Sequence, residues 1–71
     1  MATVIYHLAE AAEQKKLSLS EIARRAQISK SYVSYIARNR IHPSLYMLAQ
    51  IAEVLEVPVE ELYTVLYHER S

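Results

Sequence analysis

The fold of this chain is decided by one stretch, residues 17–38, which reads LSLSEIARRAQISKSYVSYIAR. Its apolar residues recur at helical spacing in two runs, which end at Ala26 and Ile36. A serine precedes each run where a helix cap belongs, Ser18 before the first and Ser29 before the second. We therefore expect two short helices that are separated by a tight turn.

This pair of helices has the pattern of a helix-turn-helix. Two helices that cross steeply need a small residue where they touch, and Ala23 stands at that place. Ile28 in the turn, with Val33 and Ile36 on the second helix, would lock the angle from inside. The remaining face of the second helix then points to solvent; it carries Lys30, Ser31, Ser34, Tyr35 and Arg38, with Tyr32 at its margin.

On either side of this pair, we expect three more helices. Thr3 caps a first helix that begins at Val4, and Ser44 caps a fourth. Pro58 opens a fifth helix over residues 59–67. The fourth helix carries apolar residues at i, i+3 and i+4 spacing, namely Leu45, Leu48, Ile51, Ala52 and Leu55. No window alternates with period two over a useful length, so we predict an all-α, compact five-helix domain over residues 1–71, with the helix-turn-helix at 19–38.

Length and composition limit the class of protein. The chain has 71 residues and no glycine. It also has no cysteine, so disulfides and cysteine-based zinc sites cannot stabilise its small core. No apolar run is long enough to span a membrane, and the first residues lack the pattern of a secretory signal. We expect a soluble protein of the bacterial or phage cytoplasm, associated with the nucleoid, with no membrane partner.

The net charge of zero hides a polarity along the chain. Residues 21–50 carry five Lys or Arg against Glu21 alone, a net charge of +4. Residues 51–71 carry five Glu against Arg70 alone, a net charge of −4. This asymmetry indicates a basic face for phosphate and an acidic face elsewhere. The alternative, which is strongest for Arg24 and Arg25, is ordinary solvated helix surface.

Residues 17–36 resemble the Cro/phage-repressor family of helix-turn-helix proteins, also called the XRE family. The resemblance continues through Arg38-Asn39, Pro43-Ser44-Leu45, Ile51-Ala52, Val54 to Pro58 and Glu61-Leu62, and it runs without a gap from about residue 4 to residue 63. Residues 30–34, Lys-Ser-Tyr-Val-Ser, look like the controller proteins of restriction–modification systems within that family.

The resemblance implies a lambda-repressor-like domain that reads the major groove of double-stranded DNA with its third helix. The base contacts that it implies are Lys30, Ser31 and Tyr35, followed by Ser34 and Tyr32. The phosphate contacts that it implies are Ser18, Ser29, Arg38, Asn39, Arg40 and His42. Where the family has glycine after helices two, three and four, this chain has Gln27, Asn39 and Glu56. Gln27 and Glu56 would each be strained by about 1 kcal/mol in a left-handed conformation.

The C-terminal segment is apolar around more than one helical face and suggests a two-fold interface. The residues that we assign to this dimer interface are Leu62, Val65, Leu66 and Tyr67. The alternative is that they are fraying surface residues. A symmetric dimer would place two recognition helices about 34 Å apart and would require a palindromic operator.

These observations favour a homodimeric, sequence-specific transcriptional regulator, a repressor or autoregulator. The alternative is a protein-interaction module, such as an antitoxin or anti-repressor, on the same scaffold. The three histidines share no metal-ligand spacing, so we predict no metal site. The chain has no Asp and no catalytic or phosphate-loop motif, so we expect no enzyme activity, no cofactor and no small-molecule ligand.

Overall fold

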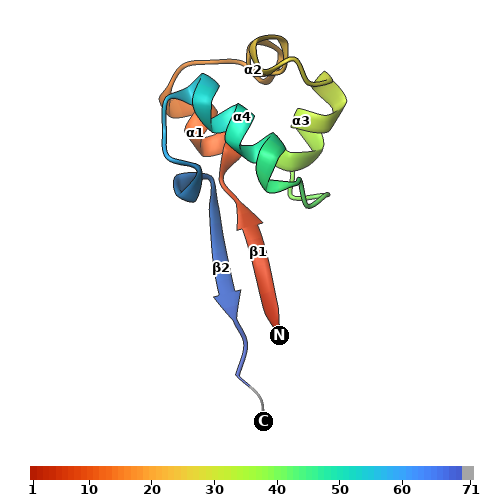
Figure 1. The fold of residues 1–71 in the computed structure, drawn as a ribbon, viewed down its shortest axis with the longest axis vertical. Coiled ribbons are helices and arrows are strands. Elements are labelled where there is room, and N and C mark those ends of the chain that lie inside the picture. The colour runs from red at the N-terminus through yellow and green to blue at the C-terminus, as the bar shows by residue number, and fades with distance from the viewer. Residues whose placement is uncertain (70–71) are drawn as a thin grey trace.

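The computed structural model describes residues 1–69 as a helical body from which a two-stranded ribbon projects (Figure 1). The elements, in chain order, are β1 (Ala2–Tyr6), α1 (Leu8–Gln14), α2 (Leu19–Ala26), α3 (Lys30–Ala37), α4 (Leu45–Leu55), the 3-10 helix η1 (Val59–Leu62) and β2 (Tyr63–Tyr67). The molecule measures 44 × 20 × 19 Å. None of the described helices has the length and apolar character needed to cross a membrane.

The helix-turn-helix is confirmed as α2 and α3, and each is capped by the serine expected from the sequence. The hydroxyl oxygens of Ser18 and Ser29 accept hydrogen bonds of 3.1 Å from the backbone N–H three residues further on. Ser44 caps α4 in the same way, also at 3.1 Å. Each cap satisfies one of the N–H groups that the first turn of a helix leaves without a partner.

One core joins all four α-helices to η1. Its buried side chains are Tyr6, Leu8, Ala12, Ile22, Ala23, Ala26, Val33, Ile36, Leu48, Ile51, Ala52, Leu55 and Leu62. Ala23 is buried as the helix crossing requires, and Ile28 in the turn packs partly against the core. Leu45, which the periodicity placed inward, is instead 66% exposed at the start of α4. Helix α3 packs against the core through the face that carries Val33 and Ile36.

The all-α, five-helix prediction is wrong at both ends of the chain. Residues 2–6 form β1 rather than a helix capped by Thr3, and the expected fifth helix over 59–67 is the single turn η1 followed by β2. The two strands pair antiparallel, with Val4 opposite Val65 and Tyr6 opposite Tyr63. The second, third and fourth helices are as expected, and the first helix is present but begins at Leu8.

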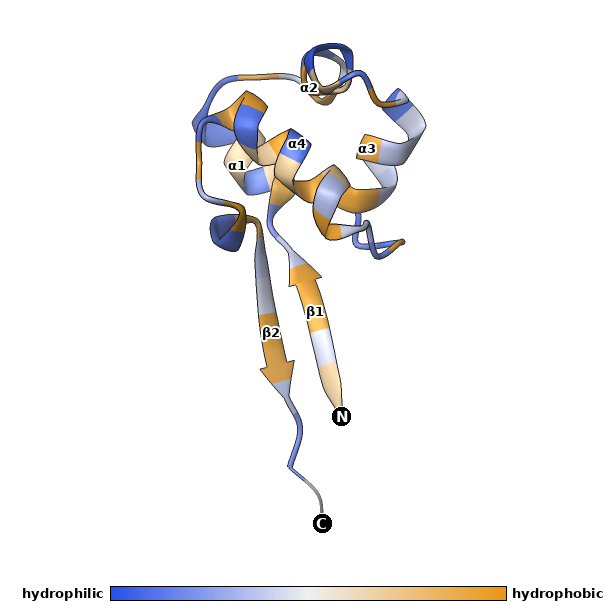
Figure 2. Ribbon diagram, viewed as in Figure 1, coloured by the Kyte–Doolittle hydropathy of each residue, from blue (hydrophilic) through white to orange (hydrophobic). Residues whose placement is uncertain are grey.

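The strand sequences explain this difference. Ala-Thr-Val-Ile-Tyr and Tyr-Thr-Val-Leu-Tyr are rich in β-branched and aromatic residues, which favour strands. Period-two alternation is absent because apolar residues follow one another along each strand, Val4-Ile5 in β1 and Val65-Leu66 in β2, and part of each strand is coloured as hydrophobic in Figure 2. Ile5 and Leu66 lie on the face away from the helices, exposed to 36% and 43%. An alternating pattern would have required one polar face.

Four non-glycine residues adopt the left-handed conformation in this glycine-free chain. Gln27, Asn39 and Glu56 have φ angles of 58°, 56° and 57°, at the three positions where the family resemblance places glycine. Lys16, after α1, is a fourth with φ of 58° and was not expected. Gln27 and Glu56 lie directly after α2 and α4, where a left-handed residue ends a helix. The turns are thus built without glycine, and the non-glycine residues at these positions carry the strain of the left-handed conformation.

Candidate nucleic-acid interface

The outward face of α3 is the face that the sequence predicted. Lys30, Ser31 and Tyr35 are exposed, and Tyr35 reaches 45% exposure although it is a large aromatic residue. Ser34 and Tyr32 are half-buried, and Tyr32 packs partly against the core. The structure therefore brings Lys30, Ser31 and Tyr35 together on one rigid, solvent-facing surface. Tyr32 lies at its edge.

Positive charge is available on and after α3. Among residues 1–69, Lys30, Arg38 and Arg40 have no carboxylate within ion-pair distance. The Arg38 guanidinium lies 5.4 Å from the centre of the Tyr35 ring, a cation–π distance. Arg38 and Tyr35 thus form one unit, with a charge that can meet phosphate and a ring held beside it.

Arg24 and Arg25 differ from these three cations because Glu21 binds both of them. The Glu21 carboxylate accepts a hydrogen bond from Arg24 and one of 3.0 Å from Nε of Arg25. These hydrogen bonds lower the pKa of Glu21 below its ordinary value. Ser18 and Glu21 have the spacing of a capping box, but only half of it forms, because the serine caps α2 whereas the Glu21 carboxylate binds Arg24 and Arg25 on the same helix.

The N-termini of α2 and α3 supply backbone N–H groups at the same motif. Ser18 and Ser29 are exposed, and each hydroxyl oxygen is engaged with its own helix. The other N–H groups of a first turn have no partner within the helix and favour an anion such as phosphate. The predicted phosphate role of these two serines therefore depends on the helix ends that they cap.

Asn39 and His42 bind β1. The Asn39 side chain accepts a hydrogen bond of 2.7 Å from the backbone N–H of Tyr6 and donates one of 3.1 Å to the Tyr6 carbonyl. The Tyr6 hydroxyl forms a 3.0 Å hydrogen bond with Nδ1 of His42. Burial raises the pKa of Tyr6, with a smaller contribution from Tyr32.

We name this contact set the Asn39 clamp; it comprises Asn39, His42 and Tyr6. The family resemblance implies phosphate contacts for Asn39 and His42, whereas the structure gives their side chains a second role, in joining the loop after α3 to the ribbon. Asn39 acts as a third strand would, because it satisfies both backbone groups of one strand residue. No local pattern pointed to this pairing, since 33 residues separate Asn39 from Tyr6. Arg40 next to it stays exposed.

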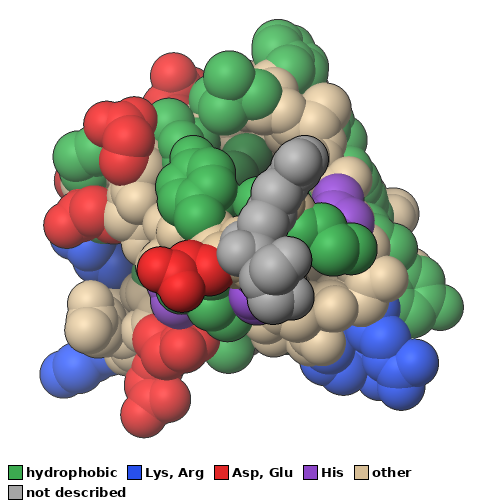
Figure 3. All heavy atoms as spheres, turned by 90° about the horizontal axis from the view of Figure 1, so that it is seen from below, with side chains coloured by type: hydrophobic (Ala, Val, Ile, Leu, Met, Phe, Trp, Pro, Cys, Tyr) green, Lys and Arg blue, Asp and Glu red, His purple; other side chains and the backbone are tan. Residues whose placement is uncertain are grey.

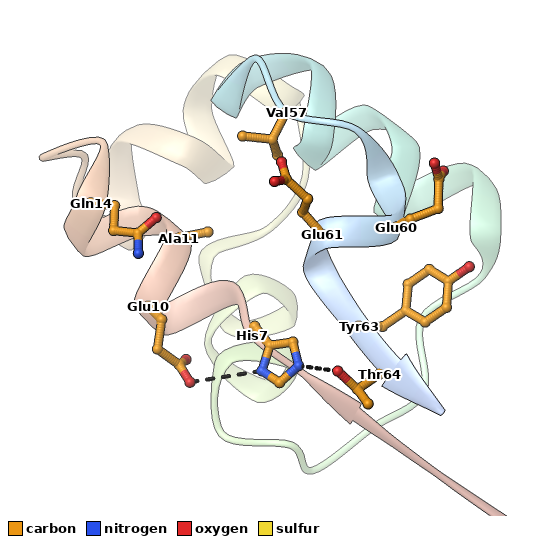
Figure 4. A pocket seen from close by; sticks show the side chains of 9 residues that line it. All are labelled: His7, Glu10, Ala11, Gln14, Val57, Glu60, Glu61, Tyr63 and Thr64. Atoms are coloured by element: carbon orange, nitrogen blue, oxygen red, sulfur yellow. Dashed lines mark hydrogen bonds and ion pairs between the residues drawn. The ribbon is translucent and has the colours of Figure 1, made fainter. Parts of the chain in front are cut away.

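A hollow of about 350 Å³ lies away from α3, between α1 and the segment from Val57 to Thr64 (Figure 4). Three carboxylates line it, those of Glu10, Glu60 and Glu61. The His7 ring lies between Thr64 Oγ1, at 2.6 Å, and the Glu10 carboxylate, at 3.8 Å. Within residues 1–69, no three His, Cys, Asp or Glu side chains are grouped as a metal site requires. The acidic lining of this hollow would repel phosphate.

The charges are distributed unevenly around the molecule. Seen from the ribbon end, most acidic side chains lie in the left half of the surface, and a group of Lys and Arg side chains lies at the lower right (Figure 3). Hydrophobic side chains surround the ribbon between them. On this face the acidic side chains therefore gather on one side, although other Lys and Arg side chains lie among them.

The four residues assigned to a dimer interface lie in different environments. Leu62 is fully buried in η1 and has no surface to offer a partner, so it is removed from the predicted interface. Val65, Leu66 and Tyr67 lie on β2 and not on a helix. Tyr67 is 82% exposed, and Leu66 projects from the opposite face of the ribbon.

Comparison with known protein families gives one match of the motif and its surroundings. A helix-turn-helix family model matches residues 8–62, from the first residue of α1 to the end of η1. The match excludes both strands of the ribbon.

Similar proteins share this part of the chain. The HTH-type transcriptional regulator SinR of Bacillus subtilis is 43% identical over 51 residues, which make up 70% of this chain and 46% of SinR. The chain thus spans about half the length of the curated relatives it matches. These relatives give no support to the narrower resemblance to restriction–modification controller proteins.

Solved structures also resemble this chain in fold. SinR, described as the master regulator for biofilm formation and crystallised in complex with DNA, is 39% identical with a TM-score of 0.70, over 75% of this chain and 86% of that one. A complex of SinR with SinI gives 38% identity and a TM-score of 0.71, over 76% of this chain and 53% of that one. A chain from Bacteroides fragilis, with a TM-score of 0.82 over 87% of this chain and 100% of that one, is 24% identical and shows the fold alone.

Proposed function

We propose that this chain, which belongs to the Cro/phage-repressor type of helix-turn-helix family, is a sequence-specific DNA-binding transcriptional regulator. It reads the major groove with α3. One observation carries the proposal. The inner side of α3 is locked in the core by Val33 and Ile36, while its outer side presents Lys30 and Tyr35 to solvent. A rigid helix with such a face is the element that a major groove admits.

Within this proposal, the side chains divide into those that read bases and those that bind phosphate. Lys30 can donate to guanine O6 or N7, and Ser31 can bond to several bases. The Tyr35 ring can pack on a thymine methyl. Arg38 and Arg40 bind phosphate together with the N-termini of α2 and α3, which sets the register of the helix on the duplex. We assign Ser34 and Tyr32 to the edge of the contact.

We further propose that two copies act together on a palindromic operator in the cytoplasm. The support is the apolar ribbon, which ends in Tyr67 at 82% exposure and carries no charged side chain from residue 2 to 6 or from 63 to 67. The dimer would place two α3 helices on successive turns of the groove.

A second candidate function is that of a module that holds another protein. It is kept because a relative has been solved with a protein partner, SinI. DNA binding separates the two candidates. A regulator neutralises phosphates and releases counterions, so its DNA affinity falls steeply and linearly with salt on logarithmic axes.

The test measures the affinity for operator and random duplexes against salt concentration, with an operator selected from a random pool. Arg40→Ala should weaken both affinities and flatten the salt slope by about one unit. Lys30→Ala should instead weaken operator binding by about 1–3 kcal/mol and relax the preference at one position. The control is Glu60→Gln in the acidic hollow, which should keep the parent's slope. Failure to bind any duplex at low salt would refute the regulator.

A further inference from the structure

The hydrogen-bond pattern of the ribbon determines which backbone groups point outward. The His7 amide donates to the Leu62 carbonyl at 2.8 Å, and the His68 amide donates to the Met1 carbonyl at 2.9 Å. Bonded and non-bonded residue pairs alternate along an antiparallel ladder. Val4 and Val65 therefore form a non-bonded pair, and their N–H and C=O groups point to the outer edges.

The two outer edges differ. On β1, Ala2, Val4 and Tyr6 point outward, but the Asn39 clamp occupies both backbone groups of Tyr6. On β2, Tyr63, Val65 and Tyr67 point outward, and within residues 1–69 none of them has a backbone partner at that edge. The β2 edge is thus open over the whole strand, whereas the β1 edge is closed next to the helical body.

Neither strand carries the features that usually protect an exposed edge. Residues 63–67 contain no Lys, Glu or Pro, and the strand is regularly paired over its length. An unprotected edge of this kind pairs readily with another strand. A two-stranded ribbon is by itself only marginally stable in water, so a third and a fourth strand would stabilise it.

We propose that the outer edge of β2 pairs antiparallel with the same edge of a second copy, which makes a continuous four-stranded sheet in the order β1–β2–β2–β1. This proposal rests on the homodimer proposed above and names its interface. The second copy is favoured as the occupant because β2 is complementary to itself. A two-fold axis at Val65 sets Val65 opposite its counterpart and Tyr63 opposite Tyr67.

The register follows from the same alternation. Only residues whose backbone groups point outward can bond across the new edge, so odd-numbered residues must face odd-numbered residues. Centring on Val65 uses all three of them, which gives six backbone hydrogen bonds. An axis at Thr64 or Leu66 also sets odd-numbered residues opposite each other, but it engages only two of the three outward residues of each strand, because the third would face residue 61 in η1 or residue 69 beyond β2. Centring on Tyr63 would run into the 3-10 turn η1, and centring on Tyr67 would leave Tyr63 unpaired. Beyond the strand, Glu61 would face the Glu69 of the second copy, and this like-charge pair ends the interface.

Side chains support this pairing on the face that looks toward the helices. An apolar groove of about 160 Å³ opens there between the ribbon and the start of α4; it is lined by Val4, Tyr6, Pro43, Leu45, Leu48, Tyr63 and Val65. Tyr67 points to the same face as Tyr63 and Val65, because alternate strand residues share a face. Across the axis, the Tyr67 ring of the second copy lies beside Tyr63 at this groove.

The expected dimer is of modest strength. A five-residue edge is about 17 Å long. Two such edges bury less than the roughly 800 Å² per partner of a standard interface. We therefore expect dimers at micromolar concentration in solution and a stronger association on DNA, where two adjacent half-sites hold the copies together.

Two proline substitutions test which edge pairs. Val65→Pro removes an outward N–H from β2 without touching the ladder between β1 and β2, and Val4→Pro does the same on β1. By sedimentation, Val65→Pro should be monomeric at concentrations where the parent and Val4→Pro are dimers. Circular dichroism checks that both variants remain folded. The reverse result would overturn the proposal and assign the β1 edge.

Disulfide trapping tests the register, because the natural chain has no cysteine. Val65→Cys places two sulfurs across the axis, where Cα atoms about 5.5 Å apart permit a bridge. Mild oxidation should therefore link Val65→Cys far more completely than the matched controls Thr64→Cys and Leu66→Cys. Equal linking of all three would overturn the register.

The outcomes also separate this interface from the proposed function. A dimeric parent whose Val65→Cys variant does not cross-link would overturn the interface and leave the homodimer standing. A parent that stays monomeric at high concentration and binds operator DNA as independent single copies would overturn both. Absence of DNA binding by a protein with a trapped β2 dimer would refute only the regulator.

Discussion

Replacing Asn39 by alanine tests whether the loop after α3 is held by the ribbon. The substitution removes the acceptor of the 2.7 Å hydrogen bond from the Tyr6 N–H and the donor of the 3.1 Å hydrogen bond to the Tyr6 carbonyl. It also leaves a residue with a Cβ but no local hydrogen bond at a φ of 56°. The helix-turn-helix core itself is untouched.

The expected loss of stability is about 2 kcal/mol. Each hydrogen bond contributes on the order of 0.5–1.5 kcal/mol net, and a partly buried group left without a partner adds to the cost. A domain of this size has a total stability of roughly 4–10 kcal/mol. A loss of 1 kcal/mol lowers the melting temperature of a domain of this size by about 4–8 °C, so we expect a fall of roughly 8–16 °C.

Two further variants separate the clamp from the backbone conformation. Asn39→Gly loses both hydrogen bonds but accepts the left-handed conformation freely. Asn39→Asp keeps an acceptor for the Tyr6 N–H, whereas its ionised carboxylate has no hydrogen to donate to the Tyr6 carbonyl. We expect the order of stability to be parent, then Asp, then Gly, then Ala.

The assay is thermal and urea unfolding at one protein concentration, since dimerisation makes the melting temperature depend on concentration. Amide hydrogen exchange at Tyr6 gives a local readout and should become faster in the Ala and Gly variants. The opposite outcome is that Asn39→Gly melts at the parent's temperature with unchanged exchange at Tyr6. That result would mean that the side chain contributes nothing to holding the ribbon.

Three other predictions concern the local structure. Gln27→Gly should stabilise the domain by up to ~1 kcal/mol, because relief of left-handed strain exceeds the entropy lost by glycine. The urea midpoint of unfolding should therefore rise. The control Gln50→Gly, inside α4, should lower the urea midpoint. Ser29→Ala should cost ~1 kcal/mol by removing the cap of α3; an unchanged urea midpoint would contradict this, and the exposed Ser31→Ala is the control. The pKa of Glu21 is lowered by its arginine partners, so its contribution is present above its ordinary pKa of 4.5 and is lost as the pH falls through the lowered value. Glu21→Gln should therefore be less stable than the parent at pH 7 and equal to it at strongly acid pH, as measured by urea unfolding at both values.

Helix α3 and its neighbours could be predicted because their signals are local. The apolar spacing of residues 17–38, with caps at Ser18 and Ser29, determines two helices within a few residues of each signal. The outward face of α3 then follows from the helical period alone. The three left-handed turns could be located because the family resemblance places glycine where this chain has Gln27, Asn39 and Glu56.

The ends of the chain could not be read in this way. The two strands would be unpaired segments if each were considered alone, and their apolar residues fit a helix or a strand equally well by spacing. Their pairing depends on contacts between residues 65 positions apart, such as Ala2 with Tyr67. A loop closure of that length is decided by the folded body that brings the two ends together, which no local pattern records.

The helix-turn-helix, its caps and the solvent-exposed face of α3 could therefore be predicted from local sequence, since each follows from side chains within one or two helical turns. Long-range contacts, by contrast, make the termini into a ribbon, close one of its edges with Asn39 and leave the edge of β2 open. The physical reason is that backbone hydrogen bonds between distant segments carry no side-chain signature. They become visible only when the core has placed the two strands side by side.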